Sequence, residues 1–363
     1  MRFGVVIPTF NRQRNLKFLF QSLESQKYKD FIVVVADDGS IDGTADYLKD
    51  LKKKHFWINR LLYISCGKHE AVRTGRARNI GAANLPNDVT HMIMLDSDLI
   101  IDPLCFSNFA SVFRLRPDLI IFGQVHWLPP LQHSKIERVI HAAGFDGLKK
   151  LITTDVPKRV KGTFVGPELR DHALFISDPL SPPHKFNASW ALPLNSAMPT
   201  DVFWKAGGYD ERMQGYGYQD IEFGVRLSQQ KPDLYCLFYQ PIIGLHIWHA
   251  KRSMNMQENQ RNLDYVLRKH GRHSANEVDI DWSIWLHYHY ERGGRIVSYK
   301  NSLWAINIDN NRRLKLPSQT WVKRLGNCIS EIRTITDKEV SGLENMGSAK
   351  ELTNILPQIG YHR

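Results

Sequence analysis

Short apolar runs that alternate with helical patterns constrain the fold of this chain most strongly. The runs RFGVVIPTF, FIVVVADDGS, HMIML and LIIFGQV (119–125) have the length and apolar content of buried strands. Between them, segments 11–26, 42–54 and 102–117 carry apolar residues at helical spacing. This alternation predicts an α/β fold, with a mainly parallel central sheet flanked by helices and joined by right-handed crossovers.

Polar side chains follow three of these predicted strands. Pro8 and Thr9 end the first strand, Asp38 follows the second, and Asp96 and Asp98 follow the third. Ligands of open α/β sheets bind beyond the carboxyl ends of the strands. The sequence therefore predicts a binding site at this edge of the sheet.

The pair Asp96 and Asp98 is the strongest candidate for a metal site. Two carboxylates this close raise each other's pKa unless a cation lies between them. Mg²⁺ and Mn²⁺ take oxygen ligands, commonly one or two carboxylates together with substrate phosphates. The alternative, an aspartate that caps a helix after a strand, fits Asp102 better, because Pro103 follows it. We interpret the pair as ligands of a divalent cation.

Two further charged segments stay open when they are judged on their residues alone. Asp38 lies in an Asp-Gly-Ser turn sequence, yet it is equally well placed to accept hydrogen bonds from a base or ribose. Arg73, Arg76 and Arg78 precede or begin a predicted helix, where guanidinium groups can meet a diphosphate. A solvated charge run is the alternative for these arginines.

The stretch GYGYQDIEF predicts a second polar region. Asp220 and Glu222 fall in the first turn of a predicted helix, where carboxylates are stabilised by the helix dipole whatever their function. The glycines and tyrosines before them predict a shaped loop with aromatic faces, as in many sugar-binding sites. His246 and His249 follow a predicted strand in LHIWHAKR, and either one can complete a metal site.

Composition adds limits on partners and compartment. A formal charge of +11 favours an anionic ligand or surface, although a solvated basic surface explains it equally well. The four cysteines form no CxxC pair, so they predict neither a zinc ribbon nor a disulfide framework. MRFGVVIPTF is too short for a signal peptide, and no apolar run reaches the roughly 18 residues of a membrane span. We expect a cytoplasmic protein, with peripheral contact at the inner face of an anionic membrane as an open alternative.

Four segments, taken together, resemble the family 2 glycosyltransferases, which are nucleotide-sugar-dependent enzymes of the GT-A fold. VVIPTFNR, VADDGSIDGT, ARNIGAAN and LDSD stand in the order and spacing of that family. The resemblance implies a GT-A domain over residues 1–254, with a nucleotide-binding half (1–125) and an acceptor-binding half (126–254). The Pro-, Gly- and Lys-rich segment 126–190 predicts irregular structure or short helices, and residues 255–363 a partly helical C-terminal extension.

A second resemblance lies in AGGYDERMQGYGYQDIEFGVRL. It is similar to the acceptor-side motif of β-1,4-galactosyltransferases, polypeptide N-acetylgalactosaminyltransferases and bacterial chondroitin polymerases, in which a glycine-aromatic loop precedes a Glu-Asp pair. This chain has Gln219-Asp220, so an amide replaces the first acid. The motif implies that Asp220 is the catalytic base, and it puts the acceptor contact of the first acid in doubt.

The resemblances imply roles for individual residues. Mn²⁺ or Mg²⁺ is the implied cofactor, with Asp96, Asp98 and His249 as its ligands and a slight preference for His249 over His246. Asp38 would face the base, and Asp96 would reach the ribose or the donor sugar. The residues implied in nucleotide binding are Pro8, Thr9, Asn11, Arg12, Asp38, Arg78 and Asp96. Those implied in contacts with the donor or acceptor sugar are Trp190, Gly208, Tyr209, Tyr218 and Gln219.

The implied function is metal-dependent, inverting transfer of a hexose or N-acetylhexosamine from a UDP-sugar to a hydroxyl of a glycan or lipid-linked acceptor. A retaining outcome stays open, because polypeptide N-acetylgalactosaminyltransferases share the acceptor-side motif. One alternative is a sugar-phosphate nucleotidyltransferase, which usually has a Gly-rich phosphate loop where this chain has PTFNRQRN. The other is a non-catalytic carbohydrate- or polyanion-binding protein on a degenerate transferase fold. We do not expect nucleic acid as a partner, and the sequence does not predict the oligomeric state.

Overall fold

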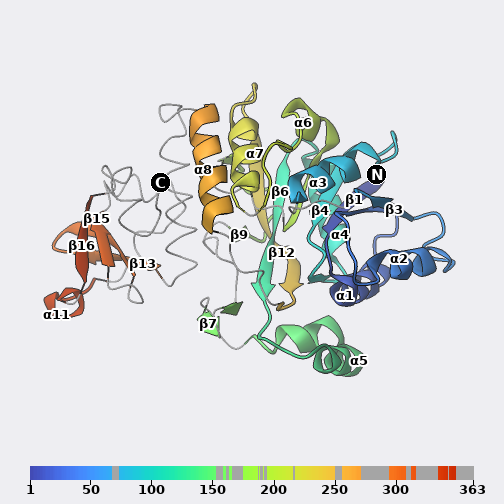
Figure 1. The fold of residues 1–363 in the computed structure, drawn as a ribbon, viewed down its shortest axis with the longest axis horizontal. Coiled ribbons are helices and arrows are strands. Elements are labelled where there is room, and N and C mark those ends of the chain that lie inside the picture. Colours follow the sequence, from blue (N-terminus) through green and yellow to red (C-terminus); the bar gives the residue numbers. More distant parts are fainter. Residues whose placement is uncertain are drawn as a thin grey trace. The chain divides into compact units, whose positions relative to one another are not determined.

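The computed structural model describes most of residues 1–270 and parts of the chain beyond them. The described ranges are 1–67, 73–152, 158–160, 163–165, 175–186, 188, 191, 194–215, 217–249, 256–270, 294–307, 312–315, 334–341 and 343–348. The chain divides into two compact units (Figure 1). One unit comprises Met1–Glu168 and Phe175–Arg272, and the other comprises Leu169–Leu174 and His273–Arg363. The sequence-based boundary at residue 254 stays a prediction.

A mainly parallel sheet forms the centre of the first unit. Its strands follow the order β10-β12-β6-β11-β4-β1-β2-β3, and β5 and β9 pair with β12. The neighbours β4, β1, β2 and β3 are parallel, as are β6 and β12, whereas β11 runs antiparallel between β4 and β6. The strands are β1 (Phe3–Thr9), β2 (Phe31–Asp37), β3 (Leu61–Ser65), β4 (His91–Leu95), β5 (Leu99–Ile101), β6 (Ile120–Trp127), β9 (Phe175–Ile176), β10 (His184–Lys185), β11 (Asn195–Pro199) and β12 (Tyr235–His246). The predicted α/β fold class is confirmed.

Helices flank this sheet and connect its strands. They are α1 (Gln13–Glu24), α2 (Thr44–Lys52), α3 (Thr74–Ala83), α4 (Cys105–Leu115), α5 (His133–Lys149), α6 (Thr200–Lys205), α7 (Gln219–Ser228) and α8 (Met256–His270). Gly144 breaks α5 with a φ of 61°, so α5 consists of two helical pieces. Short helices were predicted for this part of the chain. β7 (Lys158–Val160) and β8 (Thr163–Val165) pair with each other beyond α5.

Helices on both faces explain why β1 is buried throughout. Val5 and Ile7 of β1 belong to the main core together with residues of α1 and α4. Val6 points to the other face, because side chains alternate along a strand. There, a Cβ on Gly81 of α3 would lie only 2.6 Å from Val6 Cγ1. The missing side chain of Gly81 therefore lets α3, which also carries Arg78, lie close against the sheet.

The described part of the second unit is a small sheet with one short helix. Its strands β13 (Gly294–Tyr299), β14 (Ser302–Asn307), β15 (Arg312–Lys315) and β16 (Glu344–Ser348) lie in that order. With α11 (Asp337–Val340), they enclose a small apolar cluster around Val297 and Ile306.

Among the described residues, every helix is too short or too polar to cross a lipid bilayer.

Candidate active site

Three parallel neighbours in the sheet deliver polar residues to one edge. β4, β1 and β2 lie side by side, and Thr9 at the end of β1 stands in register with Asp37 of β2. Asp38 follows β2 directly, and Asp96 follows β4. Thr9, Asp38 and Asp96 are thus brought to the same edge of the sheet, as the sequence suggested. The hydroxyl of Thr9 is buried and makes no hydrogen bond within the described ranges, so it is available to a ligand.

The loop after β2 is tied to the loop after β1. Asn11 adopts a left-handed backbone conformation with a φ of 51°. Its side-chain Oδ1 accepts a hydrogen bond from Ile41 N at 2.8 Å, and its own N donates to Ser40 Oγ at 2.8 Å. Asp38 is held as well, because its Oδ2 accepts a hydrogen bond from Arg73 N. Asn11, expected to contact a nucleotide, here shapes the loop that presents Asp38.

Asp98 lies between two histidines at the end of β12. Its Oδ2 is 2.8 Å from His249 Nε2, and its Oδ1 is 3.3 Å from His246 Nε2. The potential ligand atoms of these three residues all lie within 4.8 Å of one another. Asp98 Oδ1 is buried and makes no hydrogen bond in the described part of the chain. A carboxylate with an oxygen that makes no hydrogen bond, together with two imidazoles, is a set of ligands that suits a divalent cation.

Asp96 does not belong to this cluster, and both candidate histidines do. The sequence suggested Asp96 as a further ligand and left the choice between His246 and His249 open, with a slight preference for His249. Burial by itself raises the pKa of Asp98, but the two histidines and Arg12 outweigh it and hold that pKa below its ordinary value. Asp98 therefore stays ionised in its buried position.

Arg12 borders the same cluster. Its Nε lies 3.9 Å from Asp98 Oδ2, and its Nη2 donates to His249 Nδ1 at 3.1 Å. Because a guanidinium only donates, Nδ1 of His249 accepts, and its Nε2 carries the proton that faces Asp98. The positive group of Arg12, which the sequence suggested as a nucleotide-binding residue, thus lies beside the candidate metal ligands.

Arg78 links Asp96, which the sequence suggested for the donor, to Asp220, which it suggested for the acceptor. Its Nη2 donates to Asp96 Oδ1 at 3.0 Å, and its Nη1 donates to Asp220 Oδ1 at 2.9 Å. The side chain of Arg78 is 5% exposed, and its guanidinium also lies over the ring of Tyr209, 5.2 Å from the centroid. One buried cation therefore joins Asp96 to Asp220, which lies 142 positions after Arg78 in the sequence.

The environment of Arg78 shifts the pKa of its neighbours. Burial raises the pKa of Asp96, and Asp98 and Asp220 add to the rise against the effect of Arg78. Burial also raises the pKa of Tyr209, whose hydroxyl hydrogen-bonds Asp220. Burial lowers the pKa of Arg78, but Tyr209, Asp220 and Asp96 outweigh it, so Arg78 stays protonated.

The remaining acceptor-side candidates form the loops around α7. Tyr209 is anchored by Asn79 of α3, whose Oδ1 accepts from Tyr209 N at 2.7 Å and whose Nδ2 donates to Tyr209 O at 2.9 Å. A Cβ on Gly208 would lie 2.6 Å from Asn79 Oδ1, which explains the glycine. Tyr218 and Gln219 are buried at the start of α7. Trp190 lies outside the described residues.

Asn79 was not singled out in the sequence, although it follows Arg78 in the ARNIGAAN motif. It connects α3 to the acceptor-side loop, so this motif positions two elements at once. Its place beside Arg78 in a family motif is the only signal that the sequence offered.

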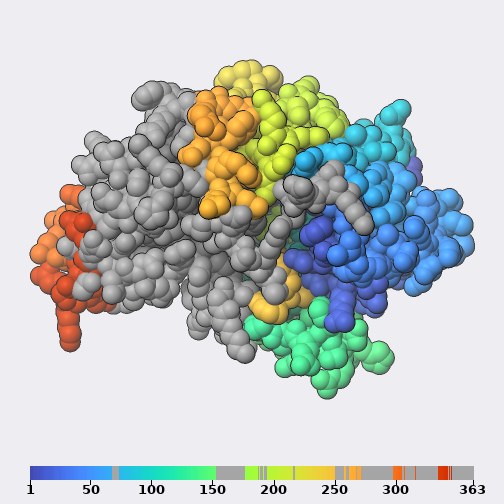
Figure 2. All heavy atoms as spheres, in the orientation of Figure 1, coloured from blue at the N-terminus to red at the C-terminus, as the bar shows by residue number. Residues whose placement is uncertain are grey.

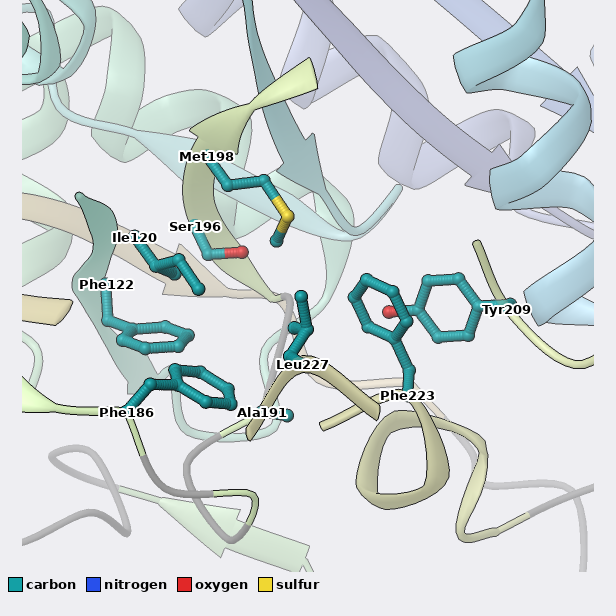
Figure 3. A pocket seen from close by; sticks show the side chains of 9 residues that line it. All are labelled: Ile120, Phe122, Phe186, Ala191, Ser196, Met198, Tyr209, Phe223 and Leu227. Atoms are coloured by element: carbon teal, nitrogen blue, oxygen red, sulfur yellow. The ribbon is translucent and has the colours of Figure 1, made fainter. Parts of the chain in front are cut away.

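A small apolar cavity lies beneath the loop of Tyr209. Figure 3 shows the rings of Tyr209 and Phe223 beside each other on one side of it, and Phe122 and Phe186 on another. Its lining comprises Ile120, Phe122, Phe186, Ala191, Ser196, Met198, Tyr209, Phe223 and Leu227. Neither the metal cluster nor Asp220 lines it, so it is a gap in the packing beneath the site.

Substituting Arg78 by methionine is expected to destabilise the protein by about 3 kcal/mol. Removing one partner of a buried ion pair costs roughly 3–5 kcal/mol, and we expect the lower end because Asp96 and Asp220 are 24% and 30% exposed. Urea unfolding measures the change. Lys205→Met, which removes an exposed pair with Asp201, is the control and should change stability by less than about 0.5 kcal/mol. A similar small change for Arg78→Met would contradict a bridging role.

Comparison with known proteins supports the family suggested by the sequence. Residues 4–138 match the family described as Glycosyl transferase family 2. Validoxylamine A glucosyltransferase of Streptomyces hygroscopicus subsp. jinggangensis is 27% identical over 282 residues, covering 74% of this chain and 60% of that protein. Chondroitin synthase of Escherichia coli is 21% identical over 283 residues, covering 73% of this chain and 39% of that protein. Hyaluronan synthase of Pasteurella multocida is 25% identical over 266 residues, covering 71% and 25%.

The chain thus spans 60% of the length of the first of these relatives and less of the other two. Among solved structures, that of S. aureus TarS 1–349 in complex with UDP-GlcNAc matches with a TM-score of 0.55 at 15% sequence identity. The match covers 80% of this chain and 74% of TarS 1–349, and it shows the likeness of the folds. Residues 4–138 of this chain therefore match glycosyl transferase family 2, and its mainly parallel sheet with flanking helices has the GT-A fold seen in TarS.

Proposed function

We propose that this chain is a metal-dependent, inverting glycosyltransferase that moves a hexose or N-acetylhexosamine from a UDP-sugar to a hydroxyl of a glycan or lipid-linked acceptor. The observation that carries the proposal is the pairing of Arg78 with both Asp96 and Asp220. This pairing brings together Asp96 and Asp220. Asp96 follows β4 two residues before the candidate metal ligand Asp98, and Asp220 belongs to the acceptor-side motif. The names of the relatives, a glucosyltransferase and two glycan synthases, and a fold shared with a UDP-GlcNAc complex support this choice.

Asp98, His246 and His249 would hold the divalent cation. A cation bound there supplies Lewis-acid neutralisation of the charge that develops on the departing nucleoside diphosphate. The two imidazoles favour Mn²⁺ over Mg²⁺, because Mg²⁺ prefers oxygen ligands. Because imidazoles bind metal ions only when they are not in the doubly protonated form, we expect metal affinity to rise with pH.

The other residues of the site divide the work between donor and acceptor. The Thr9 hydroxyl and the Asp38 carboxylate lie at the strand ends where a nucleoside would bind. The guanidinium of Arg12 would meet the diphosphate. The Asp220 carboxylate would accept the proton of the acceptor hydroxyl while the bond between the sugar C1 and the diphosphate oxygen breaks. A single displacement of this kind inverts the anomeric carbon.

A donor screen tests the proposal. Isothermal titration and donor hydrolysis are measured across UDP-, GDP- and CMP-sugars with Mn²⁺, with Mg²⁺ and with EDTA. We expect a UDP-hexose or UDP-N-acetylhexosamine to bind and turn over with Mn²⁺. EDTA should lower turnover by about 10³-fold, since a metal's stabilisation of a leaving group is worth several kcal/mol and each 1.4 kcal/mol changes a rate tenfold. Full turnover in EDTA would overturn the metal assignment. Proton NMR of the anomeric position in the transfer product should show inversion, and retention would contradict the single displacement.

The two alternatives find less support in this arrangement. A nucleotidyltransferase usually has a Gly-rich phosphate loop between its first strand and helix. Here the turn between β1 and α1 carries Asn11, which ties this turn to the loop after β2. A non-catalytic binding protein needs no buried cluster of Asp98 with two histidines, nor a base candidate joined to Asp96 through Arg78. Absence of donor hydrolysis and of transfer with every donor in the screen would favour the non-catalytic alternative.

A further inference from the structure

Helix α8 holds the loop that precedes the proposed base. Asn262 of α8 is 2% exposed, and its Nδ2 donates to Gln214 O at 3.1 Å and to Gly217 O at 3.0 Å. Arg261 Nη2 also donates to Gln214 O at 3.1 Å. From α7, Gln219 Nε2 donates to Gly215 O at 2.6 Å. Side chains therefore bind the carbonyls of three loop residues, and two of these side chains belong to α8.

Positive φ angles mark the backbone of this loop, and one of them belongs to a non-glycine residue. Gly215 and Gly217 have φ angles of 77° and 105°, and Tyr218, an L-residue with a large side chain, has a φ of 63°. Glycine adopts a positive φ without steric cost, whereas the conformation of Tyr218 persists only where the surrounding structure enforces it. A Cβ on Gly215 would lie 2.5 Å from Glu258 Cδ of α8, so this helix also packs directly on the loop. Asp220 follows Tyr218 by two residues, so the conformation of this loop determines the position of Asp220.

A second group of contacts ties α8 to α7 just behind Asp220. The Glu222 side chain is fully buried, and its Oε1 accepts hydrogen bonds from Lys269 Nζ at 2.6 Å and His270 Nε2 at 3.1 Å. Its Oε2 accepts from Arg226 Nη2 at 2.7 Å. Burial raises the pKa of Glu222, but His270, Arg226 and Lys269 outweigh it and lower the pKa to about 2.

We propose that α8 is the positioning element of the base: Asn262 fixes the loop before Asp220, and Lys269 and His270 fix Glu222 behind it. The inference rests on the proposed function, since Asp220 is the proposed base. Figure 2 shows the surface of α8, in orange, against the yellow-green surface of the α6–α7 region. The contacts of these three α8 residues given above reach the loop and Glu222, so we infer that they act on Asp220 through the loop and through Glu222.

The expected effect is on the transfer step and not on the donor. A displacement of about 1 Å in a reacting group costs roughly 10²-fold in rate. The donor-side residues lie on β1, β2, β4 and the end of β12, and none of the α8 contacts above involves these strands. Variants of α8 should therefore lower kcat and leave the KM for the donor and the affinity for UDP with Mn²⁺ unchanged.

Two substitutions in the full-length chain test this. Asn262→Leu keeps a similar size and cannot donate, and Lys269→Met removes the cation that binds Glu222. We expect kcat for transfer to fall 10- to 100-fold in each, with the donor KM and the Kd for UDP within twofold of the parent protein. Arg268→Met is the matched control, because it removes the same charge from an exposed neighbour on the same helix and should leave kcat unchanged. Thermal unfolding is recorded for all three.

The pair Lys269→Met and Glu222→Gln shows how the effect is transmitted. If Lys269 acts through Glu222, the double variant should lose no more kcat than the more damaged single variant. Fully additive losses would overturn this route.

Other outcomes separate this inference from the proposed function. An unchanged kcat in both α8 variants, beside an inactive Asp220→Asn, would overturn the role of α8 and leave the base in place. Normal transfer by Asp220→Asn would overturn the base, and the role of α8 with it. Equal losses in kcat and in UDP affinity would show general destabilisation instead of positioning. If Asn262→Leu fails to fold, Lys269→Met decides, because the side chain of Lys269 is 25% exposed and its replacement disturbs the core less.

Discussion

Asp98→Asn is expected to abolish metal-dependent turnover of a UDP-sugar, with a loss of about 10³-fold. The substitution removes the negative charge from the cluster and leaves His246 and His249 facing a neutral amide. A metal's stabilisation of a leaving group is worth several kcal/mol, and each 1.4 kcal/mol changes a rate tenfold. Steady-state turnover with saturating Mn²⁺ measures the loss, and electron paramagnetic resonance of Mn²⁺ measures binding directly.

The control for this variant makes the same change of carboxylate to amide nearby. Asp102 caps the turn before α4, where its Oδ1 accepts a hydrogen bond from Leu104 N at 2.7 Å. Asparagine caps helices about as well as aspartate, so Asp102→Asn should retain turnover. Retention of Mn²⁺ binding and turnover by Asp98→Asn would remove Asp98 from the metal site.

Asp220→Asn is expected to cut sugar transfer by about 10²- to 10⁴-fold, the range typical of a lost general base. Donor binding should stay within about twofold, because the amide oxygen can still accept the hydrogen bond from Arg78 and the metal cluster is unchanged. Pre-steady-state transfer, with the donor Kd from titration, separates the two quantities. Asp201→Asn, an exposed carboxylate at the start of α6, is the control. A loss of donor affinity without a slower transfer step would contradict the role of Asp220 as base.

β1, β2 and β4 of the parallel half were predictable because they are continuous apolar runs, as strands buried on both faces must be. β3, a partly buried strand at the edge of the sheet, was not predicted. β11 was not predicted. Its sequence, Asn195–Pro199, has small and polar residues, and the side chains of Asn195 and Ser196 are buried only because β4 and β6 close on both sides of them. This burial is a property of the tertiary fold, and local composition carries no trace of it. In the described structure, β11 therefore lies between β4 and β6, which the sequence suggested as successive strands along the chain.

The candidate site was predictable to the same limit. Carboxylates after strands can be located from the strands themselves, which is why Asp38, Asp96 and Asp98 were found. The pairing of Arg78 with both Asp96 and Asp220 was not predicted. It depends on how α3 and α7 meet in space. The sequence also left His246 and His249 as alternatives, whereas both side chains face Asp98 at the end of β12.

The Arg78 bridge has a consequence for engineering new specificities. Under the proposed function, one guanidinium pairs with a carboxylate on each substrate's side, so a substitution of Arg78 should affect the choice of donor and the acceptor together. Libraries that seek a new acceptor should therefore keep Arg78, Asp96 and Asp220 constant and diversify residues outside these contacts. Specificity for the donor and specificity for the acceptor can then be changed separately through residues that do not contact Arg78.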